Sequence, residues 1–416
     1  MSGERYVSAQ EAAAELGVSL ATLYAYVSRG LVRSQAVGGS RRVRAYLAED
    51  IQRLKERKEV RQNPEKIASK ALNWGDPVLD SELMLVGNGH VYYRGQDVLH
   101  LAESWTTEQV AALIWNVPGW QDDPERVGKE LFATQRPEPA FLEEFAVFCR
   151  QEHLAQLTPL EQFQAALPWL ASKDLAVYSQ RPEAAIAAAA RLLWLFTASL
   201  TASTTLEETI PQTLQRAWAP GEPRAAKLLN TILILNADNE LAISAFTARC
   251  AASTGATLYG CVQAALATFE GLKSSGRFLR TQQFFSEGSH LEQARQTLVK
   301  RLKQGETIPG FGHPLFPKGD PRVYSSLNAL HRYFPDAPGT IFIMALVDEA
   351  RTLLDLHPNA DLVYAALAQV LGFSAEQAFA LFALARSVGW MGHSLEQAQS
   401  GQAIRPRAHY TGIQPE

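Results

Sequence analysis

The sequence is poor in cysteine and in the glycine and proline that dominate repetitive proteins. It holds three cysteines, 27 glycines and 21 prolines among 416 residues, and 47% of its residues are hydrophobic. The thiols of Cys149, Cys250 and Cys261 are too few and too scattered for a disulfide framework or a thiolate metal site. We therefore expect no metal centre and a reducing, cytoplasmic setting. The low glycine and proline content excludes collagen-like and low-complexity classes, and the length predicts two or three domains.

Signals for export or for a membrane are also missing from the sequence patterns. The first six residues are mostly polar, which does not fit a secretory leader. The apolar stretch Leu228–Cys250 is interrupted by Asp238, Glu240 and Arg249, so it does not qualify as a membrane span. We expect no membrane partner.

Positive charge is scarce overall but concentrated at one end. The chain carries a net charge of −4, yet residues 1–62 contain nine arginines and two lysines against seven acidic residues, a charge of +4. The remaining residues therefore carry −8. A basic head gains counterion release on contact with nucleic acid, whereas an acidic body gains little. Charge alone leaves open that this asymmetry is chance.

The basic head has the pattern of a helix-turn-helix. Ser8 and Glu11 have the spacing of a capping box, and Gly17 follows the first predicted helix where a left-handed residue is needed. Ser19 is placed to cap a second helix that closes at Gly30. Two short helices joined in this way fit the geometry that lays a second helix in a major groove.

After the two helices, the sequence predicts a β-hairpin wing and then a third, capped basic helix. The hairpin spans residues 32–37 and 40–46 around Gly38–Gly39, and the helix spans residues 48–55. These features resemble the winged DNA-binding domain of the MerR family and of excisionases. The arginines could also form an ordinary solvated charge run. The predicted DNA contacts are Thr22, Tyr24, Arg29, Arg41, Arg42 and Arg44.

Beyond the head, the pattern is almost wholly helical. Apolar residues recur at helical spacing over residues 108–115, 182–200, 224–235, 244–269, 290–303, 340–354 and 375–387. Alternation typical of strands is confined to a short pair around Val86–Tyr93. We expect an all-α fold, with a winged helix-turn-helix domain at 1–60, a linker at 61–74 and a large helical domain at 75–416. Within that domain, a small subdomain is expected at about 220–325.

One loop motif suggests a functional site in the body. The segment Gly310–Arg322, GFGHPLFPKGDPR, places His313 on a glycine-bounded loop nine residues before an arginine. On residue type alone, a structural loop with a capping histidine explains it equally well. The segment resembles the signature of citrate synthases. Five further pieces occur in family order: Tyr93–Gly95, Ala237–Arg249, Asn359–Asp361, Ala385–Glu396 and Ile404–Gly412.

The resemblance implies a condensation of acetyl-CoA with oxaloacetate in a homodimer, without a tightly bound cofactor. Asp361 matches the base and His313 the ketone-polarising histidine. Arg322, Arg386 and Arg405 match the carboxylate-binding arginines, with Arg405 expected to reach the site of the other subunit. Taken singly, Asp361 could be a helix N-cap and Arg386 a helix-surface arginine. Backbone contacts to CoA are expected from Thr307, Ile308, Pro309, Gly310, Phe311 and Gly312.

Two positions depart from the family pattern. Asn239 replaces a substrate-binding histidine; it can donate a neutral hydrogen bond but cannot carry a proton. Ser274 replaces the histidine that stabilises the enol oxygen. Loss of one such donor costs about 10²–10³ in rate, so ordinary condensation should be impaired.

Three functional hypotheses follow. The first is a DNA-binding regulator responsive to a carboxylate or an acyl-CoA, which we favour because binding groups survive while catalytic groups are replaced. The second is an active citrate synthase-type acyltransferase acting on oxaloacetate or another 2-oxo acid. In the third, the head is a protein-interaction module without affinity for DNA.

Overall fold

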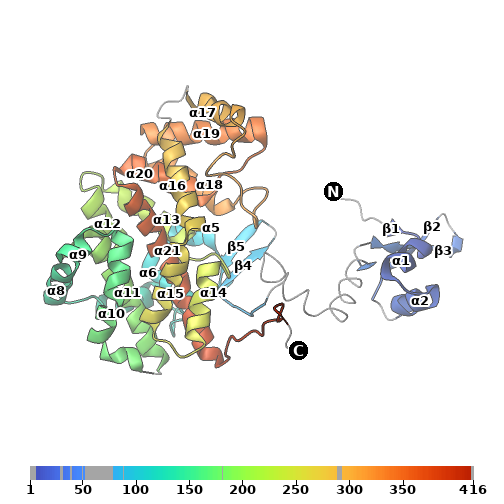
Figure 1. Cartoon of the computed structure of the whole chain (residues 1–416), viewed down its shortest axis with the longest axis horizontal. Helices are drawn as coiled ribbons and strands as arrows, with labels where there is room; N and C mark the ends of the chain where they lie inside the picture. The colour runs from blue at the N-terminus through green and yellow to red at the C-terminus, as the bar shows by residue number, and fades with distance from the viewer. Residues whose placement is uncertain are drawn as a thin grey trace. The chain divides into compact units, whose positions relative to one another are not determined.

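The structure is a computed structural model that describes residues 6–28, 31–37, 40–48, 50–51, 78–87, 89–179, 181–287 and 293–413, without the side chains of 36, 37 and 40–43. The chain divides into two compact units, Met1–Asp80 and Ser81–Glu416 (Figure 1). Each unit is described by itself. The predicted linker 61–74 and the predicted helix beyond residue 51 lie outside the described residues.

The first unit combines two helices with a small antiparallel sheet. Its elements are β1 (Tyr6–Val7), α1 (Ala9–Leu16), α2 (Leu20–Ser28), β2 (Ser34–Val37) and β3 (Ser40–Leu47). The sheet order is β1-β3-β2, so the predicted hairpin is confirmed and a short N-terminal strand joins it. Leu23 and Ile51 are fully buried in the unit's own core.

The local signals of the helix-turn-helix act as the sequence predicts. The Ser8 hydroxyl accepts from Glu11 N–H, and the Glu11 carboxylate accepts from Ser8 N–H at 2.8 Å, which completes the capping box. Gly17 is left-handed, with φ 58°. One structural ion pair in this unit has no signal in the sequence. Arg33 donates through Nε and Nη2 to the buried carboxylate of Asp50, at 2.9 and 3.0 Å.

The second unit is a large helical domain with one small sheet, in the order β4-β5-β6. The strands are β4 (Met84–Gly87), β5 (His90–Tyr93) and β6 (Gln96–Asp97). The helices up to the middle of the chain are α5 (Val98–Ser104), α6 (Thr107–Ile114), α7 (Pro124–Thr134), α8 (Pro139–Cys149), α9 (Glu152–Ala155), α10 (Pro159–Lys173), the 3-10 helix η1 (Leu175–Tyr178), α11 (Pro182–Thr201) and α12 (Ile210–Trp218). The later ones are α13 (Arg224–Leu235), α14 (Ile243–Ala252), α15 (Leu258–Phe269), α16 (Leu272–Ser286), α17 (Gln293–Lys303), α18 (Pro321–Tyr333), α19 (Pro338–Leu354), α20 (Ala360–Leu371) and α21 (Ala375–Ser400).

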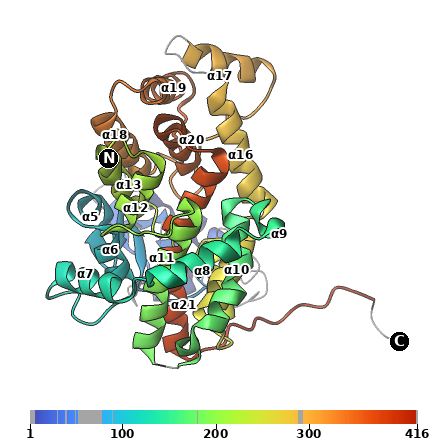
Figure 2. The same ribbon diagram turned by 90° about the vertical axis from the view of Figure 1, so that its left-hand side faces the viewer.

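Helix α21 forms the centre of this unit. It packs against α11, α14, α15 and α20, and eighteen of its 26 residues are buried. Figure 2 shows it running through the middle of the helical body, with the C-terminal stretch leading away from its end. Because α21 and α20 supply side chains to the same interior, they bring Arg386 and Asp361 into one region of the molecule. The all-α prediction for the body is confirmed.

Two details of the sequence prediction are wrong. The segment 244–269 forms two helices, α14 and α15. Gly255 lies between them with a left-handed φ of 78°, which a continuous helix cannot contain. Helix α21 continues thirteen residues past the predicted end at 387, through Gly389 and Gly392. By length and composition alone, α11 would be long and apolar enough to cross a bilayer, but 72% of its apolar window is buried inside the body, as expected for a core helix.

Candidate active site

Backbone hydrogen bonds tie the loop that carries His313 to the loop before α20. Asn359 N–H donates to the Gly310 carbonyl at 2.9 Å, and Gly312 N–H donates to the His357 carbonyl at 2.8 Å. Gly310 has φ 83°, and a Cβ there would lie 2.8 Å from a side-chain carbon of α16. Glycine is therefore required where this loop passes between α16 and α20, and the arrangement sets His313 beside the start of α20.

His313 is held as a neutral imidazole. Its Nδ1 accepts from Leu315 N–H at 3.2 Å, which places the ring proton on Nε2. Burial, with Arg322, Arg386 and Arg277 nearby, lowers its pKa to about 4. A neutral histidine with a proton on Nε2 can donate a hydrogen bond to an oxygen without carrying a charge, which suits polarisation of a carbonyl.

Asp361 lies in the first turn of α20 and is 2% exposed. The N-cap of that helix is Asn359, whose side-chain oxygen accepts from Asp361 N–H at 3.1 Å. The alternative of Asp361 as N-cap is therefore wrong. Arg277 of α16 donates through Nε to Asp361 Oδ2 at 2.6 Å. Burial raises the pKa of the Asp361 carboxyl, and the Arg277 charge opposes that rise.

Arg322 is buried and fully occupied by protein acceptors. Its Nη2 donates to Asp320 Oδ2 at 2.8 Å, and its Nε donates to Asp320 Oδ1 at 3.1 Å. The two Nη atoms also hold the loop before α14, through the Asp238 carbonyl at 2.8 Å and Asn239 Oδ1 at 3.0 Å. Because Oδ1 of Asn239 accepts from Arg322, the amide NH₂ of Asn239 is left as the group that can donate.

Arg386 is buried without an acceptor. It is 9% exposed, which excludes the alternative of a helix-surface arginine, and its Nη1 has no hydrogen-bond partner among the described residues. Its guanidinium stacks on the Phe382 ring at 5.1 Å. Burial and the Arg322 charge lower its pKa to about 10, so it remains a cation at neutral pH. An unpaired buried guanidinium is a site prepared for an anion.

The structure thus gathers part of the predicted site into what we call the His313 cluster: His313, Asp361, Arg322, Arg386 and the unpredicted Arg277. Arg277 could not be identified from sequence, because it follows a family-divergent segment and looks like any polar helix residue. Ser274 is one turn earlier on α16 and half-buried, and its hydroxyl makes no hydrogen bond with the described members of the cluster. Its predicted catalytic role stays a prediction.

Two further groups of predicted residues are not members of the His313 cluster. Arg405 is exposed in the C-terminal stretch 401–413, which has no regular secondary structure, and the described contacts do not bring it to His313. In the segment predicted to contact CoA, Ile308 and Gly310 are buried, while Thr307 and Gly312 are exposed. The full segment is Thr307, Ile308, Pro309, Gly310, Phe311 and Gly312, and nothing in the structure tests its CoA contacts.

The predicted DNA contacts lie on α2 and β3. Tyr24 is exposed on α2, and Arg44 is exposed on β3. The Thr22 hydroxyl is 2.9 Å from Ser19 Oγ, so it belongs to the cap of α2. The backbone of Arg41 and Arg42 lies in β3, whereas their side chains, and Arg29 altogether, lie outside the described residues.

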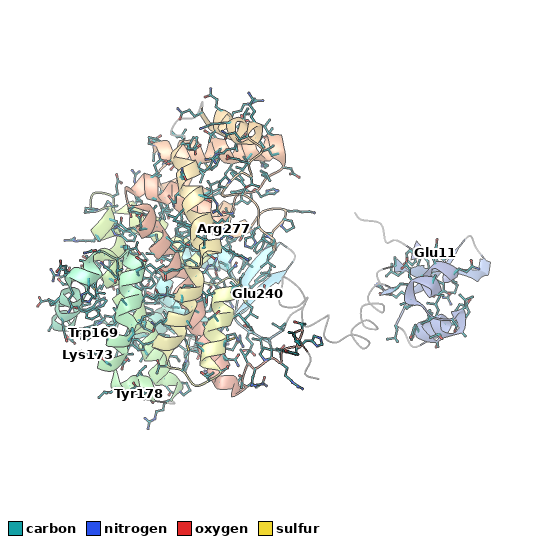
Figure 3. The ribbon with its side chains drawn as sticks, in the orientation of Figure 1. Glu11, Trp169, Lys173, Tyr178, Glu240 and Arg277 are labelled. Atoms are coloured by element: carbon teal, nitrogen blue, oxygen red, sulfur yellow. The ribbon has the colours of Figure 1, made fainter. Side chains whose placement is uncertain are left out.

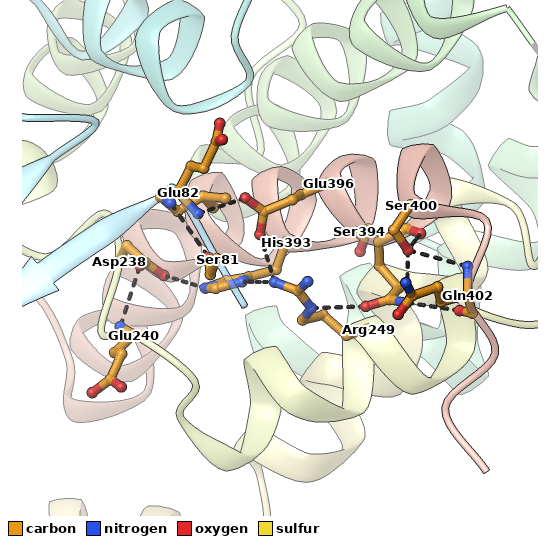
Figure 4. Close-up of polar contacts among 12 residues, drawn as sticks. Ser81, Glu82, Asp238, Glu240, Arg249, His393, Ser394, Glu396, Ser400 and Gln402 are labelled. Carbon is orange, nitrogen blue, oxygen red and sulfur yellow. Dashed lines mark hydrogen bonds and ion pairs between the residues drawn. The ribbon is translucent and has the colours of Figure 1, made fainter. Parts of the chain in front are cut away.

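A buried polar network adjoins the cluster (Figure 4). Asp238 Oδ1 is 3.3 Å from His393 Nε2, and His393 Nδ1 is 3.3 Å from Arg249 Nη1. Arg249 in turn donates to Glu396 Oε2 at 2.5 Å, and Glu396 Oε1 accepts from Glu82 N–H at 2.8 Å. The network links the Asp238 loop, which Arg322 holds, to the first residues of the second unit.

Comparisons with known proteins show the families that the two parts of the chain match. Residues 72–407 match the family model "Citrate synthase, C-terminal domain", and residues 7–64 match "MerR HTH family regulatory protein". "Citrate synthase 2" of Bacillus subtilis is 26% identical over 337 residues, 77% of this chain and 90% of that protein.

Solved structures show the same body fold. Citrate synthase from Thermotoga maritima is 26% identical with a TM-score of 0.67, over 82% of this chain and 95% of that one. Citrate synthase from Thermoplasma acidophilum, in ternary complex with carboxymethyl coenzyme A and oxaloacetate, has a TM-score of 0.70 at 21% identity, over 84% of this chain and 97% of that one.

Proposed function

Because the chain belongs to the citrate synthase family through residues 72–407, we propose that it is a DNA-binding regulator whose body binds a small carboxylate or an acyl-CoA as its signal. The observation that carries the proposal is Arg386, a buried guanidinium with an Nη1 that has no described acceptor. A ligand carboxylate at Arg386 would remove the cost of that unpaired charge. In this proposal, the MerR-type head is the part that binds DNA in response to the ligand.

The groups around Asp361 favour binding over condensation. Asn239 and Ser274 stand where the family resemblance expects histidines, so two donors of the ordinary reaction are altered. Asp361 is in addition engaged by Arg277 at 2.6 Å. The Arg277 charge opposes the rise in the Asp361 pKa that burial causes, so this carboxylate is a weaker base than it would be without Arg277. These features leave ligand affinity in place and reduce proton abstraction.

The proposed regulator acts as a homodimer. Ile243 and Leu272 are large apolar side chains, 75% and 83% exposed at the starts of α14 and α16, as expected of a surface that another subunit covers. Arg405 lies on the exposed C-terminal stretch, which is free to reach the cluster of a second subunit. The domain limits 1–60, 61–74 and 75–416, the small subdomain near 220–325 and a cytoplasmic location belong to the same proposal.

The first experiment tests whether the body responds to ligand and passes the response to the head. Genome fragments selected by the full-length protein provide its operator, and operator affinity is then measured with and without millimolar citrate, oxaloacetate or acetyl-CoA. We expect one ligand to change the affinity, and by linkage the operator must change the ligand affinity by the same factor. Recovery of no enriched sequence would contradict the regulator.

A second function is favoured by a separate observation, namely that His313 and Asp361 are brought together with a neutral imidazole. In this alternative the protein is an active citrate synthase-type acyltransferase. CoA release from acetyl-CoA and oxaloacetate tests it, beside the double variant Ser274→His, Asn239→His. Turnover by the parent would support the enzyme; turnover by the double variant alone would show a binding site that has lost its chemistry.

A further inference from the structure

Arg277 and Asp361 form an ion pair between a surface side chain and a buried one. Nε of Arg277 donates to Asp361 Oδ2 at 2.6 Å. Arg277 comes from α16 (Figure 3), and Asp361 comes from the first turn of α20. The Arg277 side chain is 56% exposed, whereas that of Asp361 is 2% exposed. A charged group that solvent can reach is therefore bound to a carboxylate that solvent barely reaches.

The backbone that carries Arg277 is held in place by packing. The next residue, Phe278, is 1% exposed. The centre of its ring lies 6.4 Å from that of Tyr364 on α20 and 5.0 Å from that of Phe379 on α21. Helix α16 also packs directly against α20. The ion pair with Asp361 thus follows from the way these helices pack, and is not a chance contact of a surface arginine.

This ion pair opposes any action of Asp361 as a base. A general base must come within about 3 Å of the proton that it removes, and Oδ2 of Asp361 already accepts from Arg277 at 2.6 Å. Burial raises the pKa of the Asp361 carboxyl, which strengthens the base, but the Arg277 charge opposes that rise. The methyl group of a thioester is a weak acid and needs a strong base. Arg277 therefore reduces both the access to Asp361 and its basicity.

We infer that Arg277 is a positioning residue that withholds Asp361 from proton abstraction, so that the body binds an acyl-CoA without turning it over. The inference rests on the proposed sensing function and says how the site is kept silent. The withheld step is transfer of a methyl proton of acetyl-CoA to Asp361. The C–H electron pair would form the double bond of an enolate, whose charge lies on the thioester oxygen. Ser274 and Asn239 then explain only part of the lost chemistry, and histidines at both positions do not restore it.

Exchange of the acetyl-CoA methyl protons with deuterium oxide tests this step without requiring condensation. NMR follows deuterium uptake with the full-length protein carrying Ser274→His and Asn239→His, alone and combined with Arg277→Ala or Arg277→Gln. We expect either change at Arg277 to raise the exchange rate about tenfold or more, since removal of an opposite charge beside a carboxyl raises its pKa by about 1–3 units.

Two matched variants in the same double-histidine protein are the controls. Arg277→Lys keeps a positive charge beside Asp361 and should keep most of the inhibition. Arg280→Ala removes an exposed arginine from the same helix and should leave the exchange rate unchanged. Arg277→Gln also guards against poor folding of Arg277→Ala, because it keeps a neutral hydrogen-bond donor beside the buried carboxylate.

The pH profile of the exchange separates a change in the base from a change in structure. The groups that face Asp361 besides Arg277 are Arg386 of α21, a cation, and His313 of the adjoining loop, whose lowered pKa of about 4 keeps it neutral. Exchange needs the ionised Asp361, so the rate should rise with pH. The midpoint of that rise should lie at higher pH for Arg277→Gln than for Arg277→Lys, whereas a structural effect would scale the rate equally at every pH.

The inference is overturned if Arg277→Ala and Arg277→Gln leave the exchange as slow as before, including no exchange at all. It is also overturned if Arg277→Lys is as fast as Arg277→Gln, or if the two midpoints coincide. These measurements do not involve DNA. Failure of the full-length protein to select an operator would therefore contradict the proposed regulator and leave the comparison at Arg277 intact.

Discussion

At the scale of single residues, the most informative feature is a buried charge that the protein does not neutralise. Arg386 is 9% exposed, and its Nη1 lacks a hydrogen-bond acceptor in the described part of the chain. A folded protein tolerates such a group when ligand binding repays the cost, which is a common trade between stability and function. The Arg386 charge thus lowers the stability of the ligand-free fold, and in the proposed function a bound carboxylate would offset that loss.

We predict that Arg386→Met raises the thermal midpoint of the ligand-free protein and removes the shift caused by citrate. Methionine fills similar space on the Phe382 ring without a charge, and removal of an unpaired buried cation should stabilise the fold by about 1 kcal/mol or more. Differential scanning fluorimetry with and without ligand measures both effects. A lower midpoint for the ligand-free variant would show that the Arg386 charge is satisfied in solution.

The depressed pKa of His313 predicts an acid-sensitive fold. Its folded pKa of about 4 lies below the ordinary 6.5, so the unfolded chain takes up the proton first as the pH falls. This residue therefore costs stability progressively between about pH 6.5 and pH 4. His313→Gln should lose less stability than the parent over that range, so the difference between their midpoints shifts in favour of the variant. Parallel melting curves from pH 7.5 to 4 check this, and curves that stay parallel would contradict it.

The cluster also shows how far residue-level prediction from sequence reaches. His313, Asp361, Arg322 and Arg386 could be proposed because they lie in motifs of recognisable order. Arg277 could not, because its role comes from the approach of α16 to α20, and no spacing in the sequence records that approach. The predicted role of Arg405 stays a prediction, because the described contacts do not bring it to His313.

At the scale of elements, Gly389 lets α21 approach the loop before α14. A Cβ at this position would collide with Asp238 Oδ1 and lie 2.7 Å from the Ala237 carbonyl oxygen, which accepts from Gly389 N–H at 2.9 Å. Glycine inside a helix ordinarily costs about 1 kcal/mol relative to alanine. Here close packing outweighs that propensity, and the glycine positions the loop that Arg322 holds.

We predict that Gly389→Ala destabilises the protein by about 1–3 kcal/mol, although alanine is the better helix former. It should also weaken the carboxylate-induced thermal shift, because the Asp238–Asn239 loop must move. Gly221→Ala is the matched control: no atom lies within 4 Å of a Cβ at that position, so it should change the midpoint little. Chemical denaturation measures the difference. Equal stability of the two variants would show that α21 can shift without cost.

The same glycines explain where the element predictions failed. Gly389 and Gly392 interrupt the helical pattern of α21, so the sequence predicted an end at 387, and only the packing against Ile114 and Asp238 shows why they are tolerated. Gly255 has the opposite effect, because its left-handed φ ends the continuous pattern at 244–269. Periodicity thus predicts which segments are helical, whereas tertiary contacts and backbone conformation determine whether a glycine ends a helix or lies within it.

At the scale of the whole molecule, the proposed regulator requires a link from the ligand site of the body towards the N-terminal end of the second unit. The buried network from Asp238 through His393, Arg249 and Glu396 ends at the backbone of Glu82, near the start of the second unit. Charged groups buried in this way hold their partners in one arrangement, because a broken link leaves an unpaired buried charge. In the proposed regulator, a ligand that moves the Asp238 loop would disturb this network as far as Glu82.

The last prediction concerns the head itself. Basic residues on β3 should contact phosphates, so Arg41→Ala with Arg42→Ala should weaken binding to all sequences and reduce the salt slope by about one for each arginine removed. Tyr24→Ala, at an exposed position on α2, should change sequence preference instead; it is cleaner than Thr22→Ala, which also disturbs the Ser19 cap. The exposed body arginines Arg126 and Arg216, replaced together by alanine, are the control for charge alone.

The arrangement of the binding site on DNA follows from symmetry. Two heads carried by a twofold dimer should prefer an inverted repeat whose half-sites lie about one helical turn apart, or a multiple of it. Gel shifts at several salt concentrations, on an operator selected from genome fragments and on spacing variants of it, measure both effects. If the salt slope is the same for the parent and for the Arg41, Arg42 double variant, the wing arginines do not contact the DNA phosphates. Indifference to half-site spacing would mean that the two heads do not bind as one symmetric unit.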